Sequence, residues 1–152
     1  MASVFLSLGS NLGDRKKSLE KALSLIEDDI GEVLSKSGIY ETDAWDYKSE
    51  NMFLNMAICI TTSLLPEALL ADIKKIEGKM GRQYSKVGYS DRPIDIDIIF
   101  YDDLIISTPE ITIPHPHMAS RRFVLQPLSD IAPDLIHPVL KKSVQTLLNK
   151  LA

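Results

Sequence analysis

The order of the hydrophobic patterns along this 152-residue chain restricts its fold more than any other feature. Alternating or β-branched apolar residues predict extended segments at 4–8, 33–40, 52–62 and 93–101. Apolar residues at helical spacing predict one helix ending at Gly31 and a second from Pro66 to Gly81. Because pairs of strands separate the helices, the order favours an α+β sandwich with a mainly antiparallel sheet over a doubly wound parallel sheet. A ferredoxin-like core is the predicted fold.

The remaining segments are predicted to be shorter. Residues 82–92 have no apolar period and are expected to form a mobile surface loop of the kind that often closes over ligands. Asp102 and Asp103 predict a turn, residues 104–106 a return strand, and the proline-rich chain up to 116 an irregular segment. Two short helices are expected, at 120–128 and 144–151.

Length and composition indicate one domain over residues 1–152. A chain with 45% hydrophobic residues can bury one core but is short for two. It has no apolar run of eighteen residues and no basic stretch before its first apolar run, so a membrane span and a secretory signal are not expected. We therefore predict a soluble, cytoplasmic protein. Cys59, the single cysteine, is predicted to be a small buried hydrophobe.

The charge distribution favours small anions over nucleic acid as partners. A formal net charge of −4 leaves no excess of cations to neutralise a polyphosphate backbone. Basic residues nevertheless cluster at Arg82, Lys86 and Arg92 and again at Arg121 and Arg122, and such clusters are sufficient for a few phosphates.

The predicted strand at 93–101 contains two carboxylates, Asp95 and Asp97, in an otherwise apolar sequence. Residues two apart in a strand point to one face, so the carboxylates share a face while Ile94, Ile96 and Ile98 anchor the other in the core. The carboxylates are then expected about 5–7 Å apart on a rigid support.

This pair has two interpretations. Two ionised carboxylates about 5 Å apart repel by roughly 3 kcal/mol at an effective dielectric near 20, and a divalent cation would relieve that repulsion. Magnesium suits a site with few protein oxygens because it keeps waters and takes further ligands from substrate phosphates, which indicates a nucleotide. Alternatively, the carboxylates lie on an ordinary exposed strand surface with Arg92 as an ion-pair partner. Local sequence does not decide between the two.

Two further motifs carry weaker signals. Residues 9–13 contain two glycines but match neither phosphate-binding glycine motif, so they predict a tight strand-to-helix turn with Asn11 bonded to the local backbone. The sequence His115-Pro116-His117 could suggest zinc, but no cysteine or third histidine is close. His115, near Arg121, is expected to donate to a phosphate oxygen, with an ordinary loop histidine as the alternative.

Asn55 is a polar amide between apolar residues in the predicted strand at 52–62, on the same face as Phe53. It must form hydrogen bonds with the backbone or with the polar edge of a planar ligand. By pattern alone, Phe53, Trp45 and Phe123 could be ordinary core or rim aromatics. Only a planar ligand explains why Asn55 has an aromatic neighbour on its face.

Several short motifs are spread over nearly the whole chain in a specific order: Gly9-Ser10-Asn11, Glu41-Thr42, Phe53-Leu54-Asn55, Gly81-Arg82, Arg92-Pro93-Ile94-Asp95-Ile96-Asp97-Ile98 and Arg121-Arg122-Phe123-Val124-Leu125-Gln126-Pro127-Leu128. Together they resemble the 6-hydroxymethyl-7,8-dihydropterin pyrophosphokinases of folate synthesis. The resemblance implies a ferredoxin-like sandwich, working as a monomer, that transfers pyrophosphate from ATP to the pterin hydroxymethyl group, giving AMP and the pterin diphosphate. It also implies two Mg²⁺ ions bridged by Asp95 and Asp97, which orient the β- and γ-phosphates for in-line attack.

The resemblance also implies a role for each matching residue. Four residues are expected to be catalytic: Arg82, Arg92, Asp95 and Asp97, with Arg82 acting mainly after loop closure. The residues expected at the nucleotide are Glu77, Arg82, Arg92, Ile98, His115 and Arg121. The residues expected at the pterin are Thr42, Ala44, Trp45, Phe53, Asn55 and Phe123, with the two phenylalanines on opposite faces of the ring and Asn55 at its polar edge.

Some residues depart from the family pattern. Tyr84 replaces an arginine and Tyr89 a tryptophan in the expected loop, and Pro116 replaces a tyrosine. The segment 43–47 also lacks the prolines and glycine that are usual there. These differences concern loop closure and the pterin contacts of Ala44 and Trp45.

Two other functions are alternatives to pyrophosphate transfer. A non-catalytic ferredoxin-like ligand-binding domain predicts no magnesium-dependent ATP binding. A metal-dependent phosphohydrolase, using Asp95 and Asp97 to activate water, predicts ATP turnover without pterin. Neither accounts for Phe53, Asn55 and Phe123 together with the arginine clusters.

Overall fold

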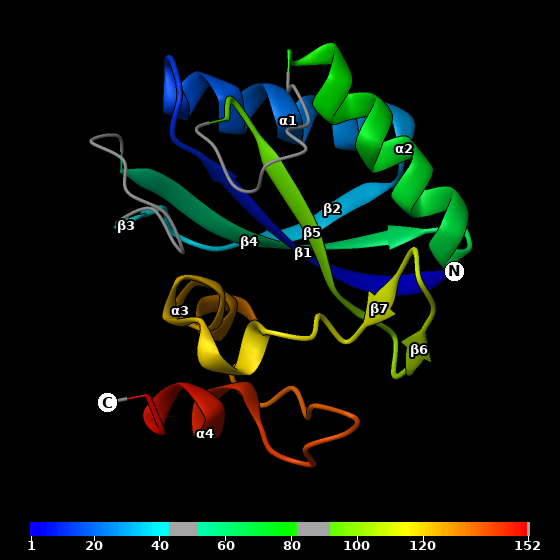
Figure 1. Ribbon diagram of the computed structural model, residues 1–152, viewed down its shortest axis with the longest axis vertical. Coiled ribbons are helices and arrows are strands. Elements are labelled where there is room, and N and C mark those ends of the chain that lie inside the picture. Colours follow the sequence, from blue (N-terminus) through cyan, green and yellow to red (C-terminus); the bar gives the residue numbers. More distant parts are fainter. Residues whose placement is uncertain (43–51, 82–91, 152) are drawn as a thin grey trace.

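An antiparallel sheet forms the central layer of the protein (Figure 1). The computed structural model describes residues 1–42, 52–81 and 92–151. The strand order is β2-β4-β1-β5, and the short β3 pairs with β4. The strands of the sheet are β1 (Ala2–Ser10), β2 (Glu32–Lys36), β3 (Tyr40–Thr42), β4 (Phe53–Thr62) and β5 (Asp95–Tyr101).

Helices cover both faces of the sheet. In Figure 1, α1 and α2 lie on one face, and α3 and α4 lie on the other. The helices are α1 (Arg15–Asp29), α2 (Pro66–Lys79), α3 (Arg122–Ile131) and α4 (Val144–Asn149), with a short 3₁₀ helix at Met118–Ser120. The α1 and α2 side has the larger apolar core, and Phe100, Leu125 and Val144 belong to a second core on the α3 and α4 side.

The topology consists of two strand-helix-strand halves, β1-α1-β2 and β4-α2-β5, whose strands interleave in one sheet. This is the ferredoxin-like α+β arrangement, so the predicted fold is confirmed. The side chains of β4 alternate between the two cores. Met56 and Ile58 lie in the larger core, and Ala57 lies in the second core on the opposite face.

The helix ends follow ordinary capping chemistry. At the start of α1, the Asp14 side chain accepts a hydrogen bond from the Lys17 amide at 3.2 Å, after Gly13 turns the chain with a φ of +71°. Pro66 begins α2, where its missing N–H costs nothing. In the described part of the chain, no helix has the length and apolar character needed to cross a membrane.

One predicted element was wrong. The strand expected at 104–106 as the return from 93–101 is instead β6 (Ile106–Ser107), and it pairs with β7 (Thr112–Ile113) in a separate two-stranded sheet. The proline-rich segment expected to be irregular therefore contains β7. The turn itself is confirmed, because Asp102 has a φ of +48° and its side chain accepts a hydrogen bond from the Ser3 amide at 2.8 Å.

Candidate active site

The two strand carboxylates lie on the face of β5 that the sequence predicts. Asp95 and Asp97 are partly exposed, whereas Ile94, Ile96 and Ile98 are buried, at 0%, 4% and 7% exposure, in the core against α1 and α2. The carboxylates therefore face the same side of the sheet as α3, on a strand anchored by three isoleucines.

The register of the sheet places Asn55 and Asp95 on either side of Gly9. Asn55 of β4 and Asp95 of β5 both pair directly with Gly9 of β1. Direct cross-strand partners point to the same face, and neighbouring strands lie about 4.8 Å apart, so the two side chains are about 10 Å apart across the glycine. Gly9 itself adds no side chain between them.

Gly9, expected in a tight turn, lies within β1, where neighbouring side chains come close to its backbone. A Cβ atom there would lie 3.1 Å from Asn55 Oδ1 and 3.3 Å from Phe53 Cδ1. The bare backbone at Gly9 lets the Phe53 ring and the Asn55 amide approach β1. The glycine directly after an alternating strand was the available signal.

Asn55 is 4% exposed, and its amide bonds a neighbouring side chain. The Nδ2 amide donates to the Thr42 hydroxyl at 2.6 Å. Thr42 itself pairs with Phe53 in the β3–β4 ladder, so the short β3 strand holds the amide in place. The structure thus brings together three predicted pterin residues: Thr42, Phe53 and Asn55.

Arg92 links the carboxylates to this aromatic group. Its side chain is 7% exposed, Nη1 lies 3.6 Å from Asp95 Oδ2, and the guanidinium lies 5.9 Å from the centre of the Phe53 ring. Its backbone exchanges hydrogen bonds with Asn11: Arg92 N–H donates to Asn11 Oδ1 at 2.8 Å, and Asn11 N–H donates to Arg92 O at 3.1 Å. Asn11 thus bonds the backbone of a residue 81 positions away in the sequence, a partner that the expected local turn did not include.

His115 is held beside β5 by its backbone. The register of β1 and β5 shifts between Phe5 and Leu6, which inserts Ile99 as an extra residue in β5. The His115 amide donates to the Ile99 carbonyl at 3.1 Å. The irregular strand end thus fixes the position of the histidine next to the carboxylate strand.

The environment of His115 keeps its ring neutral. The pKa of His115 is lowered from 6.5 to about 4, chiefly by burial and then by charge repulsion from Arg121 and His117, with Asp95 opposing them. Its Nδ1 accepts a hydrogen bond from the His117 amide at 3.2 Å, so in the neutral ring the proton is on Nε2. The opposing effects of Arg121 and Asp95 show that a cation and an anion both lie near the ring.

Arg121 and Phe123 form a second pair of guanidinium and ring, with 5.6 Å between the guanidinium and the ring centre. Arg121 is 7% exposed and directly precedes α3, while Phe123 is half-buried in its first turn. Phe53 and Phe123, both predicted to contact the pterin, therefore each lie beside an arginine predicted to contact the nucleotide.

The other predicted nucleotide residues are placed differently. Glu77 in α2 is 4% exposed, and its Oε2 accepts a hydrogen bond from the Ile96 amide at 2.9 Å. The Ile98 side chain is in the core on the face opposite the carboxylates, so it is not brought together with them. Arg82, Ala44 and Trp45 lie outside the described residues.

The donor set fits magnesium better than zinc. Within the described ranges, no three or more His, Cys, Asp or Glu side chains are grouped as a metal-ion site. Two carboxylates on a rigid strand suit a cation that takes its remaining ligands from water and phosphate, as Mg²⁺ does. The expected exclusion of zinc at His115 and His117 rests on the same chemistry, because zinc prefers several nitrogen or sulfur ligands.

The fold and the site together define a class of protein. Paired carboxylates beside two buried arginines and a neutral histidine are typical of enzymes that handle nucleotide phosphates. A neighbouring buried amide next to the Phe53 ring adds a place for a flat, polar-edged second substrate. The class is therefore a nucleotide-dependent transferase.

Known proteins place the chain within that class. Residues 5–133 match the family model described as 7,8-dihydro-6-hydroxymethylpterin-pyrophosphokinase. The chain is similar to the 2-amino-4-hydroxy-6-hydroxymethyldihydropteridine pyrophosphokinases of Aquifex aeolicus (strain VF5), at 41% identity over 95% of this chain and 89% of that protein, and of Porphyromonas gingivalis (strain ATCC 33277), at 44% identity over 91% and 95%.

Solved structures support the fold. The wild-type HPPK-DHPS of Plasmodium falciparum matches with a TM-score of 0.81 at 20% sequence identity, over 98% of this chain and 44% of that chain. This chain thus spans less than half of that solved chain.

The chain belongs to the 7,8-dihydro-6-hydroxymethylpterin-pyrophosphokinase family. It is an ATP-dependent pyrophosphokinase of folate biosynthesis, and the binding-domain and phosphohydrolase alternatives are not favoured. The family predicted from the sequence motifs is confirmed.

Proposed function

We propose that this chain transfers pyrophosphate from ATP to 6-hydroxymethyl-7,8-dihydropterin at the β5 face, with Asp95 and Asp97 holding two Mg²⁺ ions. The arrangement across Gly9 supports the proposal most directly, because Asp95 and Asn55 both pair with this one glycine of β1 and point to the same face. The proposed phosphate-binding half and the proposed pterin-binding half thus share one face of the sheet. Two substrates bound side by side on that face could each contact its own half.

On the phosphate half, the bound magnesium would neutralise phosphate charge and act as a Lewis acid. Arg92 and Arg121 supply fixed positive charge from buried positions, and Arg82 is proposed to add a third guanidinium. The neutral His115 ring is proposed to donate a hydrogen bond from its Nε2–H group to a phosphate oxygen, without adding a charge of its own. Glu77 and Ile98 were also expected at the nucleotide, but Glu77 bonds the β5 backbone and the Ile98 side chain lies in the core, so no nucleotide contact is proposed for them.

On the pterin half, Asn55 is proposed to read the polar edge of the ring while Phe53 and Phe123 cover its faces. The Thr42 hydroxyl accepts from the Asn55 amide and fixes its orientation before substrate binds. Ala44 and Trp45 are proposed to complete this half. Pre-oriented donors and acceptors would set the pterin hydroxyl in line with the transferred group.

The proposed protein acts as a monomer in the cytoplasm, without nucleic-acid or membrane partners. Its net charge of −4 is consistent with small-molecule substrates rather than a nucleic-acid backbone.

The test is an assay of AMP and pterin diphosphate by chromatography, using purified protein with ATP, Mg²⁺ and the pterin. AMP that forms only when all components are present would support the proposal. ADP formed without pterin would instead support the hydrolase alternative, and the absence of any reaction from a folded protein would support a binding domain.

Asp97→Ala tests the metal assignment within the same assay. The variant is expected to lose transfer while keeping its fold, because one of two carboxylate ligands is gone. Asp103→Ala, at the exposed turn after β5, is the matched control and should retain activity. Retained activity in Asp97→Ala would refute the metal role.

A further inference from the structure

A buried carboxylate binds the backbone of β5 between the two aspartates. Glu77 lies near the end of α2 at 4% exposure, and its Oε2 accepts the hydrogen bond from the Ile96 amide at 2.9 Å. An ionised carboxylate is expensive to bury, and a backbone N–H donor offsets part of that cost with a charge-assisted bond. Packing alone therefore does not explain why the Glu77 carboxylate is buried at this position.

The geometry of β5 supplies the reason. Among the described strands, β5 pairs only with β1, so its other edge has no strand partner. Amides alternate along an antiparallel strand, and the Ile96 amide points to this outer edge between Asp95 and Asp97. Glu77 thus holds β5 in place by a hydrogen bond to Ile96, the residue between the two carboxylates.

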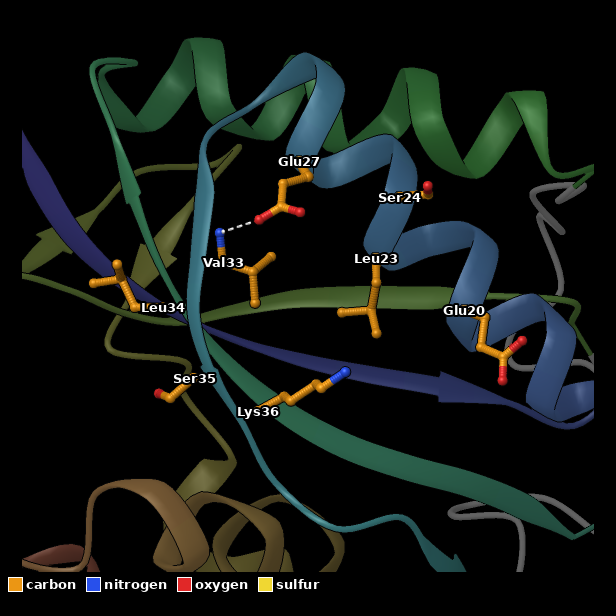
Figure 2. A pocket seen from close by; sticks show the side chains of 8 residues that line it. All are labelled: Glu20, Leu23, Ser24, Glu27, Val33, Leu34, Ser35 and Lys36. Atoms are coloured by element: carbon orange, nitrogen blue, oxygen red, sulfur yellow. Dashed lines mark hydrogen bonds between the residues drawn. The ribbon is translucent and has the colours of Figure 1, made fainter.

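The opposite edge of the sheet carries the same device in an exposed form. Glu27, near the end of α1, accepts a hydrogen bond from the Val33 amide of β2 at 3.1 Å, as Figure 2 shows. This contact lies in an open groove of about 440 Å³ between α1 and β2, and Glu27 is exposed. The two halves of the fold therefore each use a glutamate from a helix to bind an edge strand, but only Glu77 is buried and next to the carboxylate pair.

We propose that Glu77 is a positioning residue that sets the separation and orientation of Asp95 and Asp97 through the Ile96 backbone. This inference rests on the proposed metal role of the aspartates and deepens it. Glu77 acts as a hydrogen-bond acceptor of the correct length, and its charge does not serve as a metal ligand. Partners that orient metal ligands commonly change metal affinity by about 10–100-fold when removed.

Two conservative substitutions separate length from charge. Glu77→Gln keeps the chain length and a carbonyl acceptor for the Ile96 amide but loses the charge. Glu77→Asp keeps the charge but is one methylene too short to reach. A positioning role predicts that Glu77→Gln stays close to wild type and Glu77→Asp does not, whereas direct metal binding through the charge predicts the reverse order.

The first readout is Mn²⁺ affinity, measured by electron paramagnetic resonance in the presence of a non-hydrolysable ATP analogue. Glu77→Asp is expected to weaken Mn²⁺ binding by about tenfold or more, and Glu77→Gln by a few-fold at most. The second readout is hydrogen exchange of the Ile96 amide by NMR, which should become faster in Glu77→Asp and stay protected in Glu77→Gln. The matched control Glu27→Asp should change exchange at Val33 and leave Mn²⁺ affinity unchanged.

The order of the Mn²⁺ affinities of the two variants tests the positioning role of Glu77 without any measurement of turnover. Tighter Mn²⁺ binding by Glu77→Asp than by Glu77→Gln, or affinities equal to wild type in both, would overturn it. A wild-type protein that binds Mn²⁺ with the analogue but forms no AMP would contradict the proposed reaction alone, because the ranking could still be measured. Failure of the wild type to bind Mn²⁺ would overturn both.

Discussion

Asn55 is the residue on which the predicted substrate specificity depends most directly. We expect Asn55→Ala to weaken pterin binding by about tenfold or more, because a ligand edge would lose a hydrogen-bonding partner at a buried site. The affinity for ATP should change little, since Asn55 lies on the other side of Gly9 from Asp95. Calorimetric titration with each substrate separately measures both.

Thr42→Val tests whether orientation of the amide matters. This nearly isosteric change removes the hydroxyl that accepts from Asn55 Nδ2, so a smaller loss of a few-fold in pterin affinity is expected. Asn149→Ala, at the exposed end of α4, is the control and should bind pterin normally. Unchanged pterin affinity in Asn55→Ala would refute the assigned role.

His115 links the site to pH. Its folded-state pKa of about 4 lies below the unfolded value of 6.5, so the unfolded chain binds more protons between these values. The stability that His115 contributes is complete above pH 6.5 and is lost as pH falls toward 4, by at most about 3 kcal/mol.

Urea unfolding at pH 7.5 and pH 5 measures this effect. The wild type should lose more stability between the two pH values than His115→Gln, which cannot be protonated. His117→Gln removes only the smaller of the two charges that lower the pKa of His115, so its loss should lie closer to that of the wild type than to that of His115→Gln. Equal losses in wild type and His115→Gln would show that the ring is not held neutral by the fold.

The elements follow from the sequence where one local pattern decides them. Helices α1 and α2 and strands β1, β4 and β5 were predicted close to their observed bounds, because their apolar periods match their burial. The pairing of β6 with β7 was missed because each strand has only two residues, too few for a period.

The site divides in the same way. The shared face of Asp95 and Asp97 follows from strand alternation, which is local. The Asn11 to Arg92 and Glu77 to Ile96 hydrogen bonds join distant segments, and only the assembled sheet determines them. The close approach of Asn55 and Phe53 to Gly9 likewise depends on which strands lie next to β1, and no local sequence pattern shows that.

Glycine to alanine changes should have opposite effects in two elements. At the turn between α1 and β2, a Cβ on Gly31 would lie 1.9 Å from the Thr61 carbonyl oxygen, so Gly31→Ala should destabilise the protein by about 1–3 kcal/mol. In α2, a Cβ on Gly78 meets nothing within 4 Å, so Gly78→Ala should stabilise it by about 0.4–1 kcal/mol. Denaturant unfolding of both variants gives the two signs, and a stable Gly31→Ala would contradict the close approach of this turn to β4.

The two proposed substrate halves lie on one face of a single sheet. The larger core against α1 and α2 holds the opposite face, and α3 and α4 lie on the same side of the sheet as the proposed substrate halves (Figure 1). Ligands that bind β4 and β5 together should therefore stabilise the entire sheet and not only a loop. Global unfolding is the appropriate measurement of such binding.

Thermal unfolding should rise when magnesium and nucleotide bind together. A non-hydrolysable ATP analogue at about 100 times its dissociation constant adds about 2.7 kcal/mol, or about 5–11 °C for a chain of this size. Excess EDTA should remove most of the shift, because uncompensated phosphate charge would face Asp95 and Asp97. Asp97→Asn should show little shift with or without EDTA, whereas Asp103→Asn should match wild type. A shift that survives EDTA would mean that the arginines hold the nucleotide without the metal.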